Sequence, residues 1–153
     1  MNAAVLTVSD RVSRGEAHDG SGDTLEELLR SDGYEVTRRL VPDEADEIAE
    51  AIRELAAAAS LVLTTGGTGL AARDVLEREA PGIAQALRAD SIAKTPHGLL
   101  SRGTAGTIGQ TLVVNLAGSP GACRDGYAVL RPALPHALKL LADQASATDH
   151  VHT

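Results

Sequence analysis

Aromatic residues are almost absent from this chain. Tyr34 and Tyr127 are the only two, and phenylalanine and tryptophan do not occur. Modules that bind RNA or single-stranded DNA stack bases on aromatic side chains, and proteins that bind a phosphate backbone use clustered cations. The formal net charge is −7. No nucleic acid is therefore expected as a partner, and the core must be built from leucine, valine, isoleucine and alanine.

Cysteine occurs once, at Cys123. A single cysteine forms no internal disulfide and no cysteine zinc cage within one chain, and it is consistent with a reducing compartment. We expect it to be buried, and the five histidines show no metal-ligand spacing. Long hydrophobic runs are also missing: the first, residues 3–8, soon meets Asp10 and is too short for a signal peptide or a membrane span. We expect a cytoplasmic protein with no membrane partner.

What is present fits one globular domain. The chain has 153 residues, of which 43% are hydrophobic and 23% charged, and a single domain commonly has about 100–200 residues. No low-complexity run, charge block or repeat divides the sequence. We expect one domain over residues 1–145 and a flexible polar tail over 146–153.

Apolar runs and amphipathic stretches alternate along the chain. Strands are predicted at 3–8, 34–41, 61–65 and 111–116, with a weaker one at 99–103. Helices are predicted at 23–31, after Pro42 with an apolar stripe of Ile48, Ile52, Leu55 and Ala59, at 82–89, and at 121–142 with a break near Pro132 and Pro135. This alternation predicts a three-layer α/β/α fold with a mainly parallel sheet and helices on both faces.

The sharpest local feature is the glycine-rich turn after the strand at 61–65. In open α/β sheets, ligands bind beyond the carboxyl ends of the strands, and glycine lets backbone N–H groups approach a phosphate closely. A plain strand-to-helix turn is the alternative. We favour a nucleotide- or phosphate-binding loop made of Thr65, Gly66, Gly67, Thr68 and Gly69.

Two aspartates are expected at the same edge of the sheet. Asp43 follows the second strand and Asp74 follows the glycine-rich turn. Mg²⁺ prefers a few carboxylates together with phosphate oxygens, so this pair predicts a magnesium site for a nucleotide. The alternatives are that Asp43 caps the following helix and that Asp74 is a surface or capping carboxylate.

Other polar residues leave strand ends toward that edge. Asp10 is a candidate cap or a partner for Arg11, and Arg102 is a candidate anion ligand or a structural ion-pair partner. The stretch from Gly67 to Ala72 also fits a dinucleotide-binding fingerprint, but it follows the third strand rather than the first, no clear amphipathic helix is expected at Gly69, and Asp90 does not end a strand.

Several motifs occur together in a characteristic order. They are Thr7-Val8-Ser9-Asp10-Arg11, Asp19-Gly20-Ser21-Gly22, Val41-Pro42-Asp43-Glu44, Thr64 to Gly69, Arg73-Asp74-Val75, Ser101-Arg102-Gly103 and Asn115 to Pro120. With them the chain, from about residue 3 to residue 141, resembles the MogA/MoaB-like family of molybdenum cofactor biosynthesis.

The resemblance implies a reaction and a set of roles. It implies a homotrimer, or a hexamer, that transfers an adenylyl group from Mg-ATP to molybdopterin, with Mg²⁺ as the cofactor and a molybdate-inserting protein as a downstream partner. Asp43 and Asp74 would be the catalytic and metal-binding residues, and residues 65–69 the nucleotide cradle. Molybdopterin would contact the remaining strand-end residues, which are Ser9, Asp10, Ser101, Arg102, Asn115, Gly118, Ser119 and Pro120.

The chain departs from the family after Asp74. It is shorter there by about two helical turns of ~3.6 residues each, and it has Ala117 where a proline is usual. The shortening leaves a non-catalytic molybdopterin-binding or carrier protein as the main alternative. A nicotinamide-dependent oxidoreductase and an assembly subunit without chemistry are the others.

Overall fold

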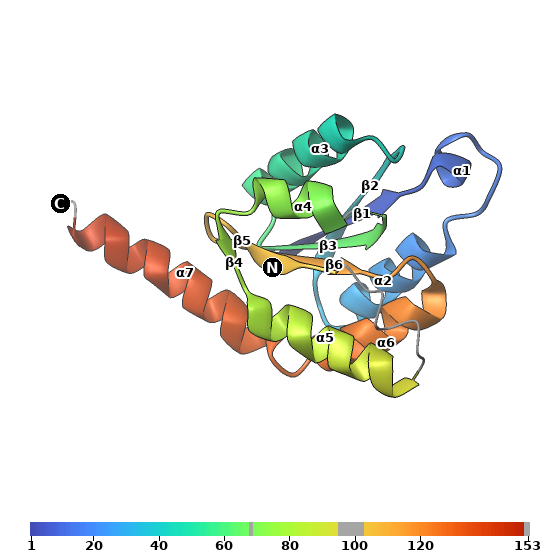
Figure 1. Cartoon of the computed structure of the whole chain (residues 1–153). Helices are drawn as coiled ribbons and strands as arrows, with labels where there is room; N and C mark the ends of the chain where they lie inside the picture. Colours follow the sequence, from blue (N-terminus) through green and yellow to red (C-terminus); the bar gives the residue numbers. More distant parts are fainter. Residues whose placement is uncertain (68, 95–102, 152–153) are drawn as a thin grey trace.

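The structure is a computed structural model that describes residues 1–67, 69–94 and 103–151. Figure 1 shows a sheet between two layers of helices. The elements follow one another as β1 (Asn2–Val8), α1 (Asp10–Ser13), α2 (Gly20–Ser31), β2 (Glu35–Val41), α3 (Ala45–Ala58), β3 (Leu61–Gly66), α4 (Gly69–Val75), β4 (Arg78–Glu79), α5 (Pro81–Lys94), β5 (Ala105–Ile108), β6 (Thr111–Leu116), α6 (Pro120–Leu130) and α7 (Leu134–Val151).

The sheet has six strands in the order β2-β1-β3-β6-β5-β4. The pairs β1–β2, β1–β3 and β3–β6 are parallel, whereas β5 pairs antiparallel with β6 and with β4. The predicted three-layer fold with a mainly parallel sheet is confirmed. Because β2, β1, β3 and β6 run in the same direction, their carboxyl ends meet at one edge of the sheet, where α1 lies in Figure 1.

The alternation of side chains along each strand builds two cores. Along β1, Val5 packs with Leu25 of α2 and with α6 and α7 on one face, while Leu6 packs with Ile48 and Ile52 of α3 on the other. All five of these side chains are fully buried or nearly so. A strand buried on both faces is a continuous apolar run, which explains why the run at 3–8 predicted β1.

Several predicted elements differ in detail from the structure. Helix α2 begins at Gly20 rather than at residue 23, because the Asp19 carboxylate caps it by accepting a hydrogen bond from the Gly22 N–H at 2.9 Å. The expectation that no helix opens at Gly69 is wrong, since α4 starts there. Strands β4 and β5 were missed because they are short and rich in small or charged residues.

The end of the chain matches the prediction of a break near the prolines. Helix α6 ends at Leu130, and α7 begins at Leu134, so that Pro135 lies in its first turn. Helix α7 continues to Val151, beyond the start of the predicted tail. The weak strand predicted at 99–103 lies outside the described residues except for Gly103, which is not in a strand. Among the helices of the described residues, none is both long and apolar enough to cross a membrane.

Candidate functional site

The β3–α4 turn is held close to its neighbours by two glycines. Gly66 has a φ of +108°, and a Cβ added there would overlap the carbonyl oxygen of Val8 at the end of β1. A Cβ added at Gly118, after β6, would lie 3.3 Å from the Cα of Gly66. Only glycine combines a positive φ with such close backbone approach. The turns that follow β3 and β6 therefore touch beside the end of β1.

Hydrogen bonds from threonine and asparagine side chains stabilise these turns. The buried Thr65 hydroxyl donates to the Ala117 carbonyl oxygen at 2.9 Å, and the Asn115 amide donates to the Thr64 hydroxyl at 2.9 Å. Thr65 and Asn115 were predicted to contact ligands. In the structure they bond to the protein itself, so any contact of Thr65 with a phosphate would come from its backbone.

Cys123 lies under the same turns and is buried, as predicted. Its Sγ is 3.4 Å from the Thr65 hydroxyl oxygen and donates to the Ala117 carbonyl oxygen at 3.3 Å. Burial raises the pKa of the Cys123 thiol. A protonated thiol is a poor nucleophile, so this residue supports packing rather than chemistry.

Asp43 faces the glycine-rich turn. Its carboxylate lies beside Gly67, where an added Cβ would be 3.3 Å from the Asp43 Oδ2. Asp43 does not cap α3: the cap position is Glu44, which makes no side-chain capping bond. Within the part of the chain that the structure describes, the Asp43 carboxylate, which is exposed, accepts no hydrogen bond and forms no ion pair. It is thus available to a ligand.

Asp10 lies next to Asp43. Its Oδ1 accepts a hydrogen bond from the backbone N–H of Asp43 at 2.9 Å. The two alternatives expected for Asp10, a helix cap and a pair with Arg11, are both replaced by this contact. The helix cap of α1 is Ser9, whose hydroxyl oxygen accepts from the Val12 N–H at 3.2 Å.

The start of α6 borders the same edge. Ser119 caps this helix by accepting from the Ala122 N–H at 3.1 Å, and Pro120 is its first residue. The N-terminus of a helix of this length favours an anion, because its first N–H groups lack partners in the helix. Thus Gly118, Ser119 and Pro120 border the turn that contains Gly66.

Asp74 is placed differently from Asp43. It is exposed and lies near the end of α4, five residues beyond Gly69, which along a helix is a rise of about 7.5 Å. In Figure 1, α4 runs back along the sheet from the edge where α1 lies.

Part of the predicted site lies outside the described residues. Thr68, Ser101 and Arg102 belong to that part. Within the described residues, no three His, Cys, Asp or Glu side chains gather where a metal ion could bind. Magnesium at this edge would therefore take few ligands from these side chains and the rest from a nucleotide and water, which is the usual arrangement for Mg²⁺.

A charge cluster that the sequence did not predict fixes the loop before α2. Asp19 accepts hydrogen bonds from the Thr7 hydroxyl at 2.8 Å and from the Arg38 guanidinium at 2.6 Å. Arg38 also pairs with Asp23 at 2.8 Å and with Glu26 at 3.7 Å. The hydrogen bond from Arg38 lowers the pKa of Asp23. The sequence analysis predicted neither the cap at Asp19 nor the role of Arg38, which is one of several polar residues of β2.

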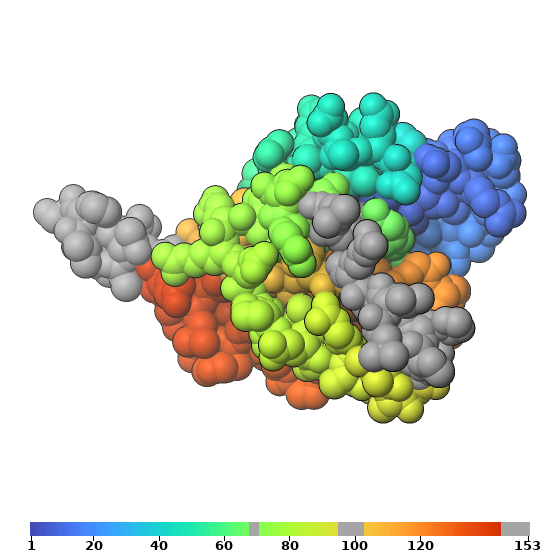
Figure 2. All heavy atoms as spheres, in the orientation of Figure 1, coloured from blue at the N-terminus to red at the C-terminus, as the bar shows by residue number. Residues whose placement is uncertain are grey.

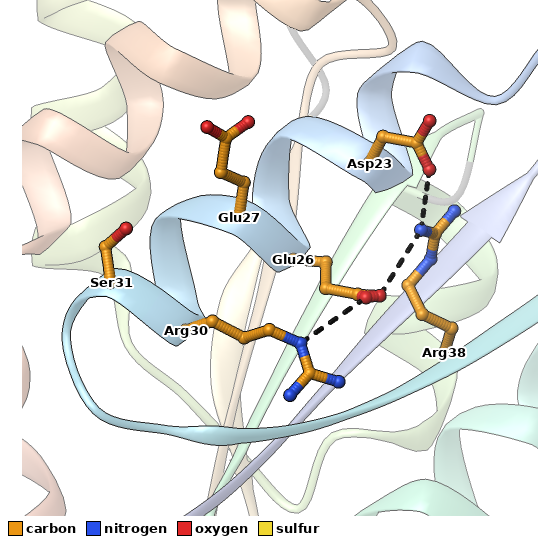
Figure 3. A pocket seen from close by; sticks show the side chains of 6 residues that line it. All are labelled: Asp23, Glu26, Glu27, Arg30, Ser31 and Arg38. Atoms are coloured by element: carbon orange, nitrogen blue, oxygen red, sulfur yellow. Dashed lines mark hydrogen bonds and ion pairs between the residues drawn. The ribbon is translucent and has the colours of Figure 1, made fainter.

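Figure 3 shows the pairs of Arg38 with Asp23 and Glu26 in a surface groove between α2 and β2. The groove has a volume of about 570 Å³ and is lined by Asp23, Glu26, Glu27, Arg30, Ser31 and Arg38. Its cations are paired with its carboxylates, since Arg30 also pairs with Glu26 at 3.6 Å. The groove is therefore a network of structural ion pairs, separate from the edge where Asp43 lies.

The structure has one feature of a dinucleotide-binding site, the helix after the glycine-rich turn, and lacks another, the acidic residue at a strand end. Helix α4 does open at Gly69, but the acidic residue Asp90 lies inside α5 and pairs with Lys94 at 2.9 Å instead of ending a strand. A ribose-binding carboxylate belongs at a strand end. The fingerprint is therefore incomplete.

Comparison with known proteins gives the family. A family model described as "Probable molybdopterin binding domain" matches residues 4–136. The chain belongs to this family, with MogA and MoaB. Its fold is similar to that of the molybdopterin biosynthesis enzyme MoaB from Thermus thermophilus, at 40% identity and a TM-score of 0.84 over 92% of this chain and 95% of that chain.

Curated relatives of this MogA/MoaB-like chain differ in length. The Helicobacter pylori protein named molybdopterin adenylyltransferase is 32% identical over 92% of this chain and 88% of its own length. The Drosophila melanogaster molybdenum cofactor synthesis protein cinnamon is 36% identical over 97% of this chain. The match covers only 27% of cinnamon. The chain thus spans about a quarter of that relative and most of the bacterial one.

Proposed function

We propose that this protein of molybdenum cofactor biosynthesis transfers the adenylyl group of Mg-ATP to molybdopterin. A terminal phosphate oxygen of molybdopterin attacks the α-phosphorus of ATP. The bond from that phosphorus to the bridging oxygen breaks, which gives adenylyl-molybdopterin and pyrophosphate. The observation that carries the proposal is the Asp43 carboxylate, unpartnered among the described residues and facing the Gly67 backbone at the edge of the sheet. The family membership and the name of the Helicobacter relative support the choice of substrates.

The proposed adenylyl transfer requires no covalent intermediate with the protein. Phosphoryl and nucleotidyl transfer depend on positioning and on neutralising negative charge. The Mg²⁺ that accompanies ATP would supply positive charge near Asp43. The backbone of residues 65–67 and the N-terminus of α6 would orient the phosphates of the two substrates. A chain with a net charge of −7 needs these local groups to hold two anions.

A second candidate is a molybdopterin-binding protein without turnover. Asp74 favours it, because this predicted catalytic residue is exposed and lies near the end of α4, five residues beyond Gly69. In this case the edge would bind the pterin phosphate, but the second carboxylate would not reach a bound nucleotide. The homotrimer, the downstream molybdate-inserting partner and the cytoplasmic location stay predictions.

One assay separates the two candidates. The purified protein is incubated with molybdopterin and Mg-ATP, and adenylyl-molybdopterin and pyrophosphate are quantified for the parent and for Asp43→Asn, Asp74→Asn and Glu27→Gln. Glu27 is a control because it is exposed, lines the α2 groove and makes no hydrogen bond or ion pair with the described residues. Product that falls strongly in Asp43→Asn and is unchanged in Glu27→Gln would support the transferase.

The remaining results are also informative. Product that survives unchanged in Asp74→Asn would remove Asp74 from the mechanism while leaving the transferase in place. Tight molybdopterin binding without any product would favour the binding protein. Neither binding nor product would contradict both candidates.

A further inference from the structure

Beyond the last residue pair of β1 and β2, a side chain accepts the hydrogen bond that a backbone carbonyl would accept within the sheet. The last register pair is Val8 with Val41, and the Ser9 N–H then donates to the Val41 carbonyl oxygen at 3.1 Å. The next residue on β2 is Pro42, which has no N–H to donate. The N–H of Asp43 follows, and it donates to the Asp10 Oδ1 at 2.9 Å. A carboxylate thus continues the pairing where the backbone of β1 has already turned into α1.

Asp10 itself is held in place. It is the first residue of α1, which the Ser9 hydroxyl caps, and its carbonyl oxygen accepts from the Arg14 N–H at 3.0 Å. On the other side, the Glu44 N–H donates to the Pro42 carbonyl oxygen at 2.8 Å. The backbone of Asp43 is therefore restrained from two sides, by Asp10 and by the tight turn from Pro42 to Glu44.

The Asp43 side chain has no such restraint. Among the described residues its carboxylate makes no hydrogen bond or ion pair, although it lies against Gly67. The place of this carboxylate at the turn thus depends on the backbone that carries it, and Asp10 is the side chain that bonds to that backbone across 33 residues of sequence.

We infer that Asp10 is a positioning residue for the proposed reaction, which orients the Asp43 carboxylate at the glycine-rich turn by accepting the hydrogen bond of the Asp43 N–H. This inference rests on the proposed function. It differs from the ligand contact expected for Asp10 from the sequence. In a positioning role, what matters is an oxygen acceptor at this place, not a negative charge.

The first test compares two substitutions of Asp10. Asp10→Asn keeps a side-chain oxygen that accepts from the Asp43 N–H, whereas Asp10→Ala removes it. Because a displacement of about 1 Å near the reacting atoms can cost about 100-fold in rate, we expect Asp10→Ala to lower kcat by about 10- to 100-fold with a smaller change in KM. Asp10→Asn should recover most of that loss. Glu27→Ala, which removes an exposed carboxylate without a partner among the described residues, is the matched control.

The second test is a double-mutant cycle with Asp43. If Asp10 acts through Asp43, then Asp10→Ala should change the residual turnover of Asp43→Asn by no more than about twofold, because coupled sites are not additive. The Asp43 amide proton gives a readout that needs no turnover. Its exchange with solvent, followed by NMR, should be faster in Asp10→Ala and largely restored in Asp10→Asn.

The possible failures are distinguishable. Losses that are equal for Asp10→Asn and Asp10→Ala would show that the charge is needed and would overturn the positioning role. Additive losses in the cycle, or an Asp43 amide whose exchange ignores Asp10, would do the same. If the parent chain makes no adenylyl-molybdopterin, the proposed function falls and this inference with it. If the parent is active but the losses are additive, only this inference falls.

Discussion

Replacing Gly66 with alanine tests how closely the β3–α4 turn is fitted to β1. At a φ of +108°, an alanine has an unfavourable backbone conformation, which costs about 1–2 kcal/mol. Its Cβ would also overlap the Val8 carbonyl oxygen, so the ends of β1 and β3 must separate at their last register pair, Val8 with Gly66. Each ladder hydrogen bond lost costs about 1 kcal/mol. We expect Gly66→Ala to lower the free energy of unfolding by roughly 2–4 kcal/mol.

The assay is unfolding in guanidinium chloride, followed by circular dichroism, with thermal unfolding beside it. The loss corresponds to a fall in Tm of roughly 4–16 °C for a chain of this size. Gly82→Ala is the control, since Gly82 lies in α5 with no atom within 4 Å of an added Cβ and without a positive φ. That change should be neutral or stabilise by up to about 1 kcal/mol. A loss below 1 kcal/mol for Gly66→Ala, or one equal to the control, would refute the close fit.

Three further predictions concern the charge cluster and the cysteine. Arg38→Met leaves the mostly buried carboxylate of Asp19 without its cation and should cost about 1–3 kcal/mol in the free energy of unfolding. The same change at Arg39, whose pair with Glu54 is more exposed, should cost less than about 1 kcal/mol; equal losses would contradict this view of the cluster. Because the pKa of Asp23 is lowered from 3.8 by folding, its contribution is present above that pH and lost as the pH falls through the folded value. Asp23→Asn should therefore flatten the loss of stability in acid, and an unchanged pH profile would count against it. The Cys123 thiol, whose pKa is raised by burial, should react with a disulfide reagent at neutral pH only after unfolding, and rapid labelling of the native protein would show that it is accessible.

Elements with strong periodic patterns were predictable from the sequence. The apolar runs that became β1, β3 and β6 are buried on both faces, and the stripe of Ile48, Ile52 and Leu55 packs as expected on α3. Ala59, the last residue of the predicted stripe, lies beyond the helix in an extended conformation. Strand β5 was missed because its pairing with β6, and not its composition, makes it a strand.

The candidate site was predictable in its location and less so in its geometry. The rule for parallel sheets placed Asp43 and Gly67 at one edge, and the structure brings them together. The rule gave Asp74 the same location. In the structure Asp74 is the sixth residue of α4, and this helix runs back along the sheet from the edge. In Figure 2, the segment that contains α1 is the blue region at the right of the molecule, at the edge where the candidate site lies.

The sequence by itself determined the layers, the order of the long strands and helices, and the edge of the sheet where glycines and aspartates gather. These features depend on periodicity and on chain direction, which are local. Only the tertiary structure decided that Asp10 bonds to the Asp43 backbone, that Arg38 joins Asp19 to Asp23, and that Thr65 turns inward to the Ala117 carbonyl oxygen. These contacts join residues far apart in the chain, and their distances depend on how the strands pack side by side. No pattern within a single segment encodes that packing.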